Sequence, residues 1–382
     1  MDPASSPPLA AWDLGAIAAV TPAASGLMHQ TFFVDAAAGR FVIQRLHHLL
    51  GTPEILTDYQ AVTAHLAARG LSAPRLVPTA AGDRVATDAA GRWWRLTTRV
   101  PGATHDKVRG PADAEAGARM LGRFHVAMAD IDHVFLSAHP LHDTPAHLAR
   151  LQAALADPAH AAERAAIEPE VSEILEELPR LMLPDDLPRR VVHGDPKISN
   201  VMFEGEAAVG LIDLDTCNRH SVLVDLGDAV RSWCRDGYED ELQRFHLDRF
   251  AAIVRGYAAE GLPLTAQERA LLPDAGRLIT LELAARFARD SLEDHYFAWD
   301  ATRYADRRTH NRARMRSMLY LARTGGAPRR GGAHRGRGPG LRRPAGALWL
   351  SAARRPGRPS GAPSGCRPRR ACRGRGPGCS AA

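Results

Sequence analysis

The first hundred residues alternate short apolar runs with glycine, proline and polar turn residues, which is a pattern typical of strands. Between two of these runs lies PEILTDYQAVTAHLAARG, whose apolar residues recur at helical spacing from Pro53 towards Gly70. Residues 1 to about 12 lack such a pattern and are expected to be a flexible lead-in. The expected strands are residues 25–35, 39–46, 83–88 and 92–100. This part of the chain therefore predicts a small lobe of strands with one helix.

After Gly102 the apolar residues recur every three or four positions, so most of the remaining body is expected to be helical. Residues 191–215 interrupt this pattern with two short apolar runs typical of strands. The expected helices are residues 113–131, 168–182, 241–261, 278–297 and 308–323. A strand-rich lobe followed by a larger helical lobe predicts an α+β, bilobal fold with a cleft, divided into residues 1–99 and 100–324.

The net charge of +6 is unevenly distributed along the chain. Of the 49 basic residues, 14 are arginines in the segment 325–382, which contains no acidic residue; 35 basic and 43 acidic residues remain in the body before it. The tail is rich in Gly, Pro and Arg, has no apolar periodicity and is expected to be disordered. Three interpretations of it stay open: an out-of-frame translation of GC-rich DNA, an ordinary disordered appendix, and an element that binds nucleic acid or another anionic surface.

Composition also limits the class of protein. No run approaches the roughly 18 apolar residues of a membrane span, and the N-terminus lacks the basic and apolar regions of a signal peptide, so a cytoplasmic protein without a membrane partner is expected. The cysteines show no zinc-ligand spacing with histidines. Cys217 and Cys234 are expected to be reduced and structural.

The stretch VVHGDPKISNVMFEGEAAVGLIDLD, residues 191–215, places charged groups between apolar runs. Buried carboxylates are costly unless a cation meets them, and phosphoryl transfer needs a base, magnesium ligands and a cation for the developing charge. An Asp followed by four residues and an Asn matches the kinase catalytic loop, which makes Asp195 the expected base and Asn200 a metal ligand. Lys197 would lie beside the transferring phosphate. The two apolar runs predict a hairpin that returns Asp213 to the same Mg²⁺ ion.

These motifs, in this order, resemble the catalytic core of the aminoglycoside phosphotransferase family, whose fold is protein-kinase-like. FVIQRLHHLL, WWRLTTRVPGATHD and ITLELAARFARDSLEDHYF are similar to its N-acetylhexosamine 1-kinase branch. The likeness runs from about Ser25 to Leu321. It implies a magnesium-dependent kinase that transfers the γ-phosphate of ATP to a hydroxyl of a sugar or amino sugar.

The family also carries an Asp that braces the catalytic loop. In LVDLGDAVRS both Asp225 and Asp228 are candidates, with Arg231 as a partner, and a helix N-cap with an i,i+3 ion pair describes Asp228 and Arg231 equally well. His193 is expected to have a structural hydrogen-bonding role.

The resemblance also implies nucleotide contacts in the first lobe. Ser25 and Gly26 would lie in the loop that covers the phosphates. The connection between the lobes would act as a hinge whose backbone, at Thr98 and Val100, contacts the adenine.

The fold normally has a lysine in the strand 39–46, but neither lysine of the chain lies there. Gln44 takes the position by simple alignment and Arg45 follows it, and strand alternation lets only one of them face the cleft. We take Arg45 as the expected nucleotide-binding cation, although its planar fork is not equivalent to a lysine. Asp58 or Glu54 would be its helix partner.

The sequence therefore predicts a small-molecule kinase that uses ATP and Mg²⁺. Aminoglycoside, homoserine and choline-type substrates are alternatives, as are a nucleotide-binding relative without activity and a nucleic-acid-binding protein acting through the tail. Contacts to the substrate are expected from the helical lobe, although a solvated helix face explains each candidate as well. The candidates are His142, Asp143, Glu282, Asp290, Glu293 and Asp294.

Overall fold

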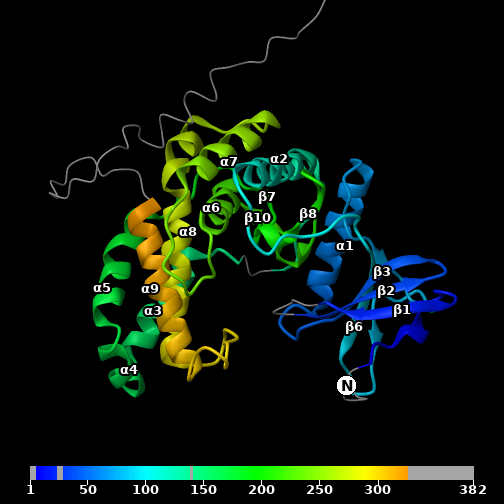
Figure 1. Cartoon of the computed structure of the whole chain (residues 1–382), viewed down its shortest axis with the longest axis horizontal. Helices are drawn as coiled ribbons and strands as arrows, with labels where there is room; N and C mark the ends of the chain where they lie inside the picture. Colours follow the sequence, from blue (N-terminus) through cyan, green and yellow to red (C-terminus); the bar gives the residue numbers. More distant parts are fainter. Residues whose placement is uncertain (1–5, 24–28, 138–140, 326–382) are drawn as a thin grey trace, which may run out of the picture.

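The computed structural model describes residues 6–23, 29–137 and 141–325, so the predicted tail lies outside the described residues. It confirms the bilobal, kinase-like architecture: the strands of the N-lobe gather on one side and the helices of the C-lobe on the other (Figure 1). The antiparallel N-lobe sheet has the order β1-β2-β3-β6-β4, and β5 pairs with β6. Its strands are β1 (Ile17–Pro22), β2 (Gln30–Ala36), β3 (Gly39–Arg45), β4 (Leu76–Val77), β5 (Ala86–Thr87) and β6 (Trp93–Thr98).

The two faces of this sheet follow the alternation of its residues. On one face, side chains such as Ile43 of β3 and Trp94 of β6 build the N-lobe core. On the other face, Gln44 and Arg95 lie directly opposite each other in the β3–β6 register. The polar residues Gln44 and Arg95 are thus placed together on the sheet face that lies towards the C-lobe.

The prediction of a flexible lead-in up to about residue 12 was wrong for its last residues, where Leu9–Ala11 form a short 3-10 helix. Trp12 is only 4% exposed and its indole donates a hydrogen bond to the Val77 carbonyl at 2.9 Å. Leu14 joins the same core. The strand β1 was not predicted either, because its six residues are all exposed and carry no alternation.

Helix α1 (Pro53–Ala68) lies in the N-lobe part of the chain and packs against the C-lobe. Thr52 caps it by accepting a hydrogen bond from the Ile55 amide, and Pro53 occupies the first turn, where its missing N–H costs nothing. Its buried face, including Tyr59 and Val62, belongs to the hydrophobic core of the C-lobe.

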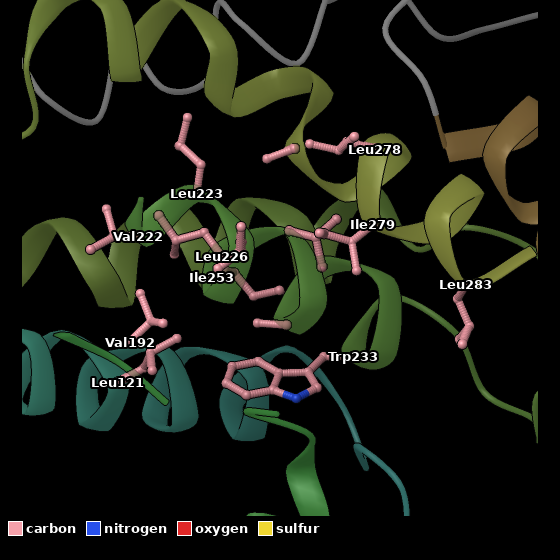
Figure 2. Close-up of a cluster of buried hydrophobic side chains, with 14 of the residues drawn as sticks. Leu121, Val192, Val222, Leu223, Leu226, Trp233, Ile253, Leu278, Ile279 and Leu283 are labelled. Carbon is pink, nitrogen blue, oxygen red and sulfur yellow. The ribbon is translucent and has the colours of Figure 1, made fainter. Parts of the chain in front are cut away.

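The C-lobe core forms where α2 packs along α7, and where α8 packs against α6 and α9. Figure 2 shows side chains of α6, such as Leu226 and Trp233, meeting Ile253 of α7 and Ile279 of α8. The helices are α2 (Pro111–Ala127), α3 (Thr144–Ala156), α4 (Ala161–Ala165), α5 (Glu168–Glu177), α6 (Val222–Trp233), α7 (Leu247–Ala259), α8 (Ala266–Glu293) and α9 (Arg307–Gly325).

Several helix boundaries differ from the prediction, and the largest differences are at the starts of α8 and α7. The helix α8 begins at Ala266 rather than near Leu278, because Thr265 and Glu268 form a reciprocal capping box there. The helix α7 begins only at Leu247. None of the helices within the described residues has the length and apolar character needed to cross a membrane.

The interruption in the helical lobe consists of two small antiparallel sheets, one pairing β7 (Arg190–Val192) with β10 (Asn218–His220), the other a hairpin of β8 (Val201–Glu204) and β9 (Ala207–Leu211). The predicted hairpin is therefore confirmed. The connection between the lobes is fixed to it, because Ala103 and Phe203 exchange two backbone hydrogen bonds. Gly102, with φ +92°, allows this approach, since a Cβ there would collide with the Phe203 carbonyl.

Candidate active site

The loop after β7 turns sharply at Gly194. Its φ is +88°, and a Cβ at this position would lie 2.6 Å from the Thr216 carbonyl oxygen, so glycine is required. The amides of His193 and Gly194 donate to the two carboxylate oxygens of Asp225, at 2.6 and 2.9 Å. Asp225, at the start of α6, is therefore the residue that braces the loop.

The brace is itself held in place. His125 contacts Asp225 through Nε2 at 2.9 Å and contacts the Tyr257 hydroxyl through Nδ1 at 2.8 Å. Burial by itself would raise the pKa of Asp225, but His125 and the loop amides lower it below its usual range. The loop is thus anchored to a fully buried, ionised carboxylate.

His193 has the structural hydrogen-bonding role that the sequence suggested. Its Nε2 lies 3.0 Å from the Ile212 carbonyl, and the Asp195 amide donates to its Nδ1 at 3.3 Å. These partners match a single neutral tautomer, with the proton on Nε2. The ring ties the catalytic loop to the residue that precedes Asp213.

Three predicted residues meet within the catalytic loop. Lys197 Nζ lies 2.7 Å from Asp195 Oδ2, and Asn200 Nδ2 donates to the Asp195 carbonyl at 2.8 Å. Burial would raise the pKa of Asp195, but the charge of Lys197 lowers it, so the carboxylate is ionised. Burial would lower the pKa of Lys197, but Asp195 and Asp213 raise it. An ionised carboxylate and an ammonium group therefore stand side by side.

Asp213 follows the hairpin in a left-handed conformation, with φ 64° and ψ 53°. The Ile212 amide donates to the Asn200 carbonyl at 3.0 Å, which joins the two expected metal ligands through the backbone. Within residues 6–23, 29–137 and 141–325, no group donates a hydrogen bond to the Asp213 carboxylate. Burial, followed by the charge of Asp215, raises its pKa.

The surroundings of Asp213 fit a hard divalent cation. Ligand atoms of His29, Asp213 and Asp215 all lie within 4.8 Å of one another. Because the Asn200 amide nitrogen is engaged with Asp195, the amide oxygen is the atom left for a metal. Carboxylate and amide oxygens are the ligands that Mg²⁺ prefers.

A buried arginine, which the sequence did not single out, lies next to this position. Arg95 of β6 is 1% exposed and forms a bidentate pair with Asp215, with Nη–Oδ distances of 2.5 and 2.6 Å. Its Nε and Nη2 also donate to Gln44 Oε1, at 3.0 and 2.8 Å. The guanidinium lies 4.3 Å from the centre of the Tyr59 ring of α1. The second carboxylate oxygen of Asp215 also contacts His29 at 3.2 Å.

This network joins both lobes through one ion pair. Burial would lower the pKa of Arg95, but Asp215 raises it, and burial would raise the pKa of Asp215, but Arg95 lowers it. Both groups are therefore charged. A bidentate pair of this kind defines the orientation of both side chains.

The structure does not bring Arg45 to this site. Arg45 pairs in register with Trp94 and shares the sheet face of the N-lobe core, whereas Gln44 lies on the opposite face and contacts Arg95. The cation at this place comes from β6 instead of β3. The sequence feature that could have pointed to Arg95 is a charged residue in the middle of the otherwise uncharged strand WWRLTT.

The expected helix partner also differs. Asp58 accepts hydrogen bonds from His133 and from the amides of Leu136 and Ser137, so it holds that segment instead of a cation in the cleft. Glu54 lies in the exposed first turn of α1. The residue of α1 that touches the cleft cation is Tyr59.

The other expected nucleotide contacts are only partly placed. Ser25 and Gly26 lie outside the described residues. The Thr98 amide already donates to the Arg75 carbonyl at 2.8 Å, so an adenine contact at this residue would need another group. Val100 is buried, and a Cβ on Gly210 would lie 3.1 Å from its side chain. The nucleotide-binding roles of all four residues remain predictions.

Most of the expected substrate contacts in the helical lobe have structural partners. Asp143 caps α3 by accepting from the Ala146 amide. Asp290 accepts from the amides of residues 295–297. Glu293 pairs with Arg289, and Asp294 ends α8 in a left-handed conformation near Arg307.

Among the described residues, two of these candidates keep a buried side-chain atom without a hydrogen-bond partner, His142 at Nε2 and Glu293 at Oε2. Glu282 accepts from His142 at 2.8 Å and from Thr144 at 2.5 Å. The other ring nitrogen of His142, Nε2, is buried and has no partner within the described part of the chain.

The sequence model of the phosphotransferase enzyme family, APH, matches residues 19–260, more than half of the chain. The chain belongs to this family. It is 29% identical over 306 residues to a homoserine kinase of Polaromonas naphthalenivorans, which covers 76% of this chain and 86% of that protein. A homoserine kinase of Beijerinckia indica is 30% identical over 294 residues, with 75% and 84% covered.

Solved structures agree on the fold. An amicoumacin kinase, hAmiN, superposes with a TM-score of 0.55 at 18% identity, over 78% of this chain and 88% of that one. A microcompartment-associated aminopropanol kinase gives a TM-score of 0.55 at 20% identity, over 83% and 93%. The solved structures thus support the kinase-like fold, and membership of the phosphotransferase family makes the chain a small-molecule phosphotransferase, an enzyme that acts on hydroxyl groups.

Proposed function

We propose that this enzyme transfers the γ-phosphate of ATP, with Mg²⁺, to a hydroxyl of a sugar or amino sugar. The observation that carries the proposal is the meeting of Asp195, Lys197, Asn200 and Asp213 on one loop and hairpin. Their order and arrangement suit in-line phosphoryl transfer, in which positioning and charge stabilisation supply most of the rate.

Each residue has one task in this reaction. Asp195, held ionised by Lys197, accepts a hydrogen bond from the attacking hydroxyl and takes its proton. Lys197 offsets the charge that develops on the transferring phosphoryl group. Asn200 and Asp213 would hold Mg²⁺, which neutralises phosphate charge when bound.

An inactive relative is less well supported. The sequence suggested it because no lysine lies in β3. Arg95, however, supplies a buried cation between the lobes that is bonded to Asp215 and to Gln44, the residue aligned with that lysine. A cation is therefore still present between the lobes.

The sugar acceptor rests on the resemblance of three segments to the N-acetylhexosamine 1-kinases. Homoserine is the second candidate, because the curated relatives at 28–30% identity are homoserine kinases. Homoserine would offer a primary hydroxyl to Asp195 and the sugar an anomeric one. The catalytic loop therefore does not discriminate between these two acceptors.

A substrate panel tests the proposal. The full chain would be assayed for ADP release with Mg–ATP and N-acetylglucosamine, N-acetylgalactosamine, glucosamine, homoserine, choline or kanamycin, with Asp195→Asn as the blank. Turnover on the sugars that disappears in the blank supports the proposal. Turnover on homoserine alone would replace the sugar with the second candidate, and turnover that persists in the blank would overturn the role of Asp195.

A further inference from the structure

Residues 131–137 follow α2 and form a strap that runs between α1 and β10. Of the apolar side chains in this strap, Ile131 is buried and Phe135 packs against the C-lobe core. Val134 and Leu136 are 80% and 51% exposed, so they hold the strap only weakly. Its course is therefore fixed largely by hydrogen bonds.

Asp58 of α1 is the anchor at one end of the strap. Its Oδ1 lies 2.8 Å from His133 Nε2 and accepts from the Leu136 amide at 3.0 Å, and its Oδ2 accepts from the Ser137 amide at 2.8 Å. Burial by itself would raise the pKa of Asp58, but these amides and His133 lower it below its usual range. An ionised, buried carboxylate therefore binds the strap to α1, and hydrogen bonds to an ionised acceptor are the strong ones.

The other end of the strap is anchored by two side chains of β10. Arg219 Nη2 donates to the carbonyls of Ile131 and His133, at 3.2 and 3.4 Å. Asn218 Nδ2 donates to the Ser137 carbonyl at 3.2 Å. Because β10 pairs with β7, the strand that leads into the catalytic loop, the strap connects α1 with the base of that loop.

The position of α1 matters for the site in two ways. The helix packs against the short 3-10 helix Leu214–Thr216, which directly follows Asp213. Its residue Tyr59 also covers the guanidinium of Arg95, which pairs with Asp215. A displacement of α1 would therefore disturb the segment that carries both aspartates.

We propose that Asp58 is a positioning residue for phosphate transfer: it anchors the strap, and the strap holds α1 against residues 213–216. Within the described ranges, the side-chain partners of Asp58 all belong to the strap, so it acts through α1 and not on the reacting groups. Coupling of this kind needs a continuous chain of contacts, which the strap supplies. The inference concerns phosphate transfer itself and holds for a sugar or a homoserine acceptor alike.

Nucleotide binding in the full chain tests this role. Asp58→Ala should lower the affinity for Mg–AMP-PNP, measured by calorimetry well below the Tm of every variant, by roughly five-fold or more. Its Tm should also fall, because two buried amides lose their acceptor. Asp58→Asn keeps one acceptor oxygen, so its affinity should lie between those of Asp58→Ala and the wild type.

Asp88→Ala is the matched control for a purely structural effect. Asp88 also accepts from two amides, those of Ala90 and Arg92 at 2.9 and 3.0 Å, and from the Trp94 indole at 2.9 Å. Trp94 belongs to the N-lobe core, on the sheet face opposite Arg95. Asp88→Ala should therefore lower the Tm but leave the affinity for Mg–AMP-PNP within about two-fold of the wild type. If Asp58→Ala gives this same result, the positioning role is overturned.

Cutting the strap at its other end tests whether the effect passes through it. Arg219→Met keeps an apolar stem, removes the hydrogen bonds to the strap and should also weaken binding of Mg–AMP-PNP. The double variant Asp58→Ala with Arg219→Met should bind no more weakly than the weaker single variant, because either cut already releases α1. Losses that multiply in the double variant, or wild-type affinity in Arg219→Met, would overturn the inference. Should Asp58→Ala not fold, Asp58→Asn takes its place in this comparison.

Discussion

Replacing Arg95 with methionine should loosen the junction between the lobes. Methionine keeps an apolar stem but removes the guanidinium, so Asp215 keeps only the contact with His29. Removing one partner of a buried ion pair costs about 3–5 kcal/mol, because the remaining charge is left without compensation. The bidentate geometry and full burial of this pair place it at the strong end of that class.

The assay is thermal unfolding followed by calorimetry. For a domain of this size, 3 kcal/mol or more corresponds to a decrease in Tm of at least about 5 °C. Arg40→Met is the control, since Arg40 pairs with Asp35 at 3.1 Å on the same sheet but with side chains 67% and 45% exposed. Such a surface pair contributes about 0–1 kcal/mol.

A double variant tests whether the lost stability comes from the uncompensated charge of Asp215. Arg95→Met with Asp215→Leu removes both charges, so it should be more stable than Arg95→Met alone. If Arg95→Met lowers the Tm no more than Arg40→Met does, the pair does not join the lobes, and the account of the N-lobe cation is wrong.

The stabilisation of the fold by the Arg95–Asp215 pair should change with pH in a defined direction. Because Arg95 holds the pKa of Asp215 below its usual range, the pair stabilises the fold above about pH 4 and this contribution is lost as the pH falls further. The difference in Tm between the wild type and Arg95→Met should therefore be constant between about pH 5 and pH 8 and should shrink at more acidic pH.

Three further substitutions test other parts of the site. Gly194→Ala puts a Cβ 2.6 Å from the Thr216 carbonyl at φ +88°, a strain of roughly 1–3 kcal/mol, and should lower kcat at least ten-fold; wild-type kcat would contradict it. Asp225→Ala leaves two buried amides and His125 without their acceptor and should lower the Tm by several degrees, whereas an unchanged calorimetric Tm would remove the brace. Asp213→Asn should weaken binding of Mg–AMP-PNP in a magnesium titration, and unchanged affinity would count against the metal role.

The catalytic hairpin could be predicted from the sequence because its parts are close together in the chain. HGDPKISN and IDLD are separated only by the hairpin of β8 and β9, so local structure alone returns Asp213 towards Asn200. The choice between Asp225 and Asp228 as the brace could not be made, since both lie on the same side of α6. Only the contacts with the loop amides distinguish them.

The network of Arg95 depends on long-range pairing. Gln44 and Arg95 become neighbours through the β3–β6 register, and Asp215 joins them only when the lobes meet. No short motif contains these residues, so a missing lysine in β3 was visible in the sequence while its substitute was not. Trp12 was missed for the same reason, because its partner Val77 lies on a distant strand.

The most direct test of the account compares phosphate transfer with nucleotide binding in Asp195→Asn. The predicted result is wild-type-like affinity for Mg–AMP-PNP by calorimetry, together with a loss of about 100-fold or more in single-turnover transfer from ATP to the acceptor found in the panel. Transfer at the wild-type rate would contradict the assignment of Asp195 as the base.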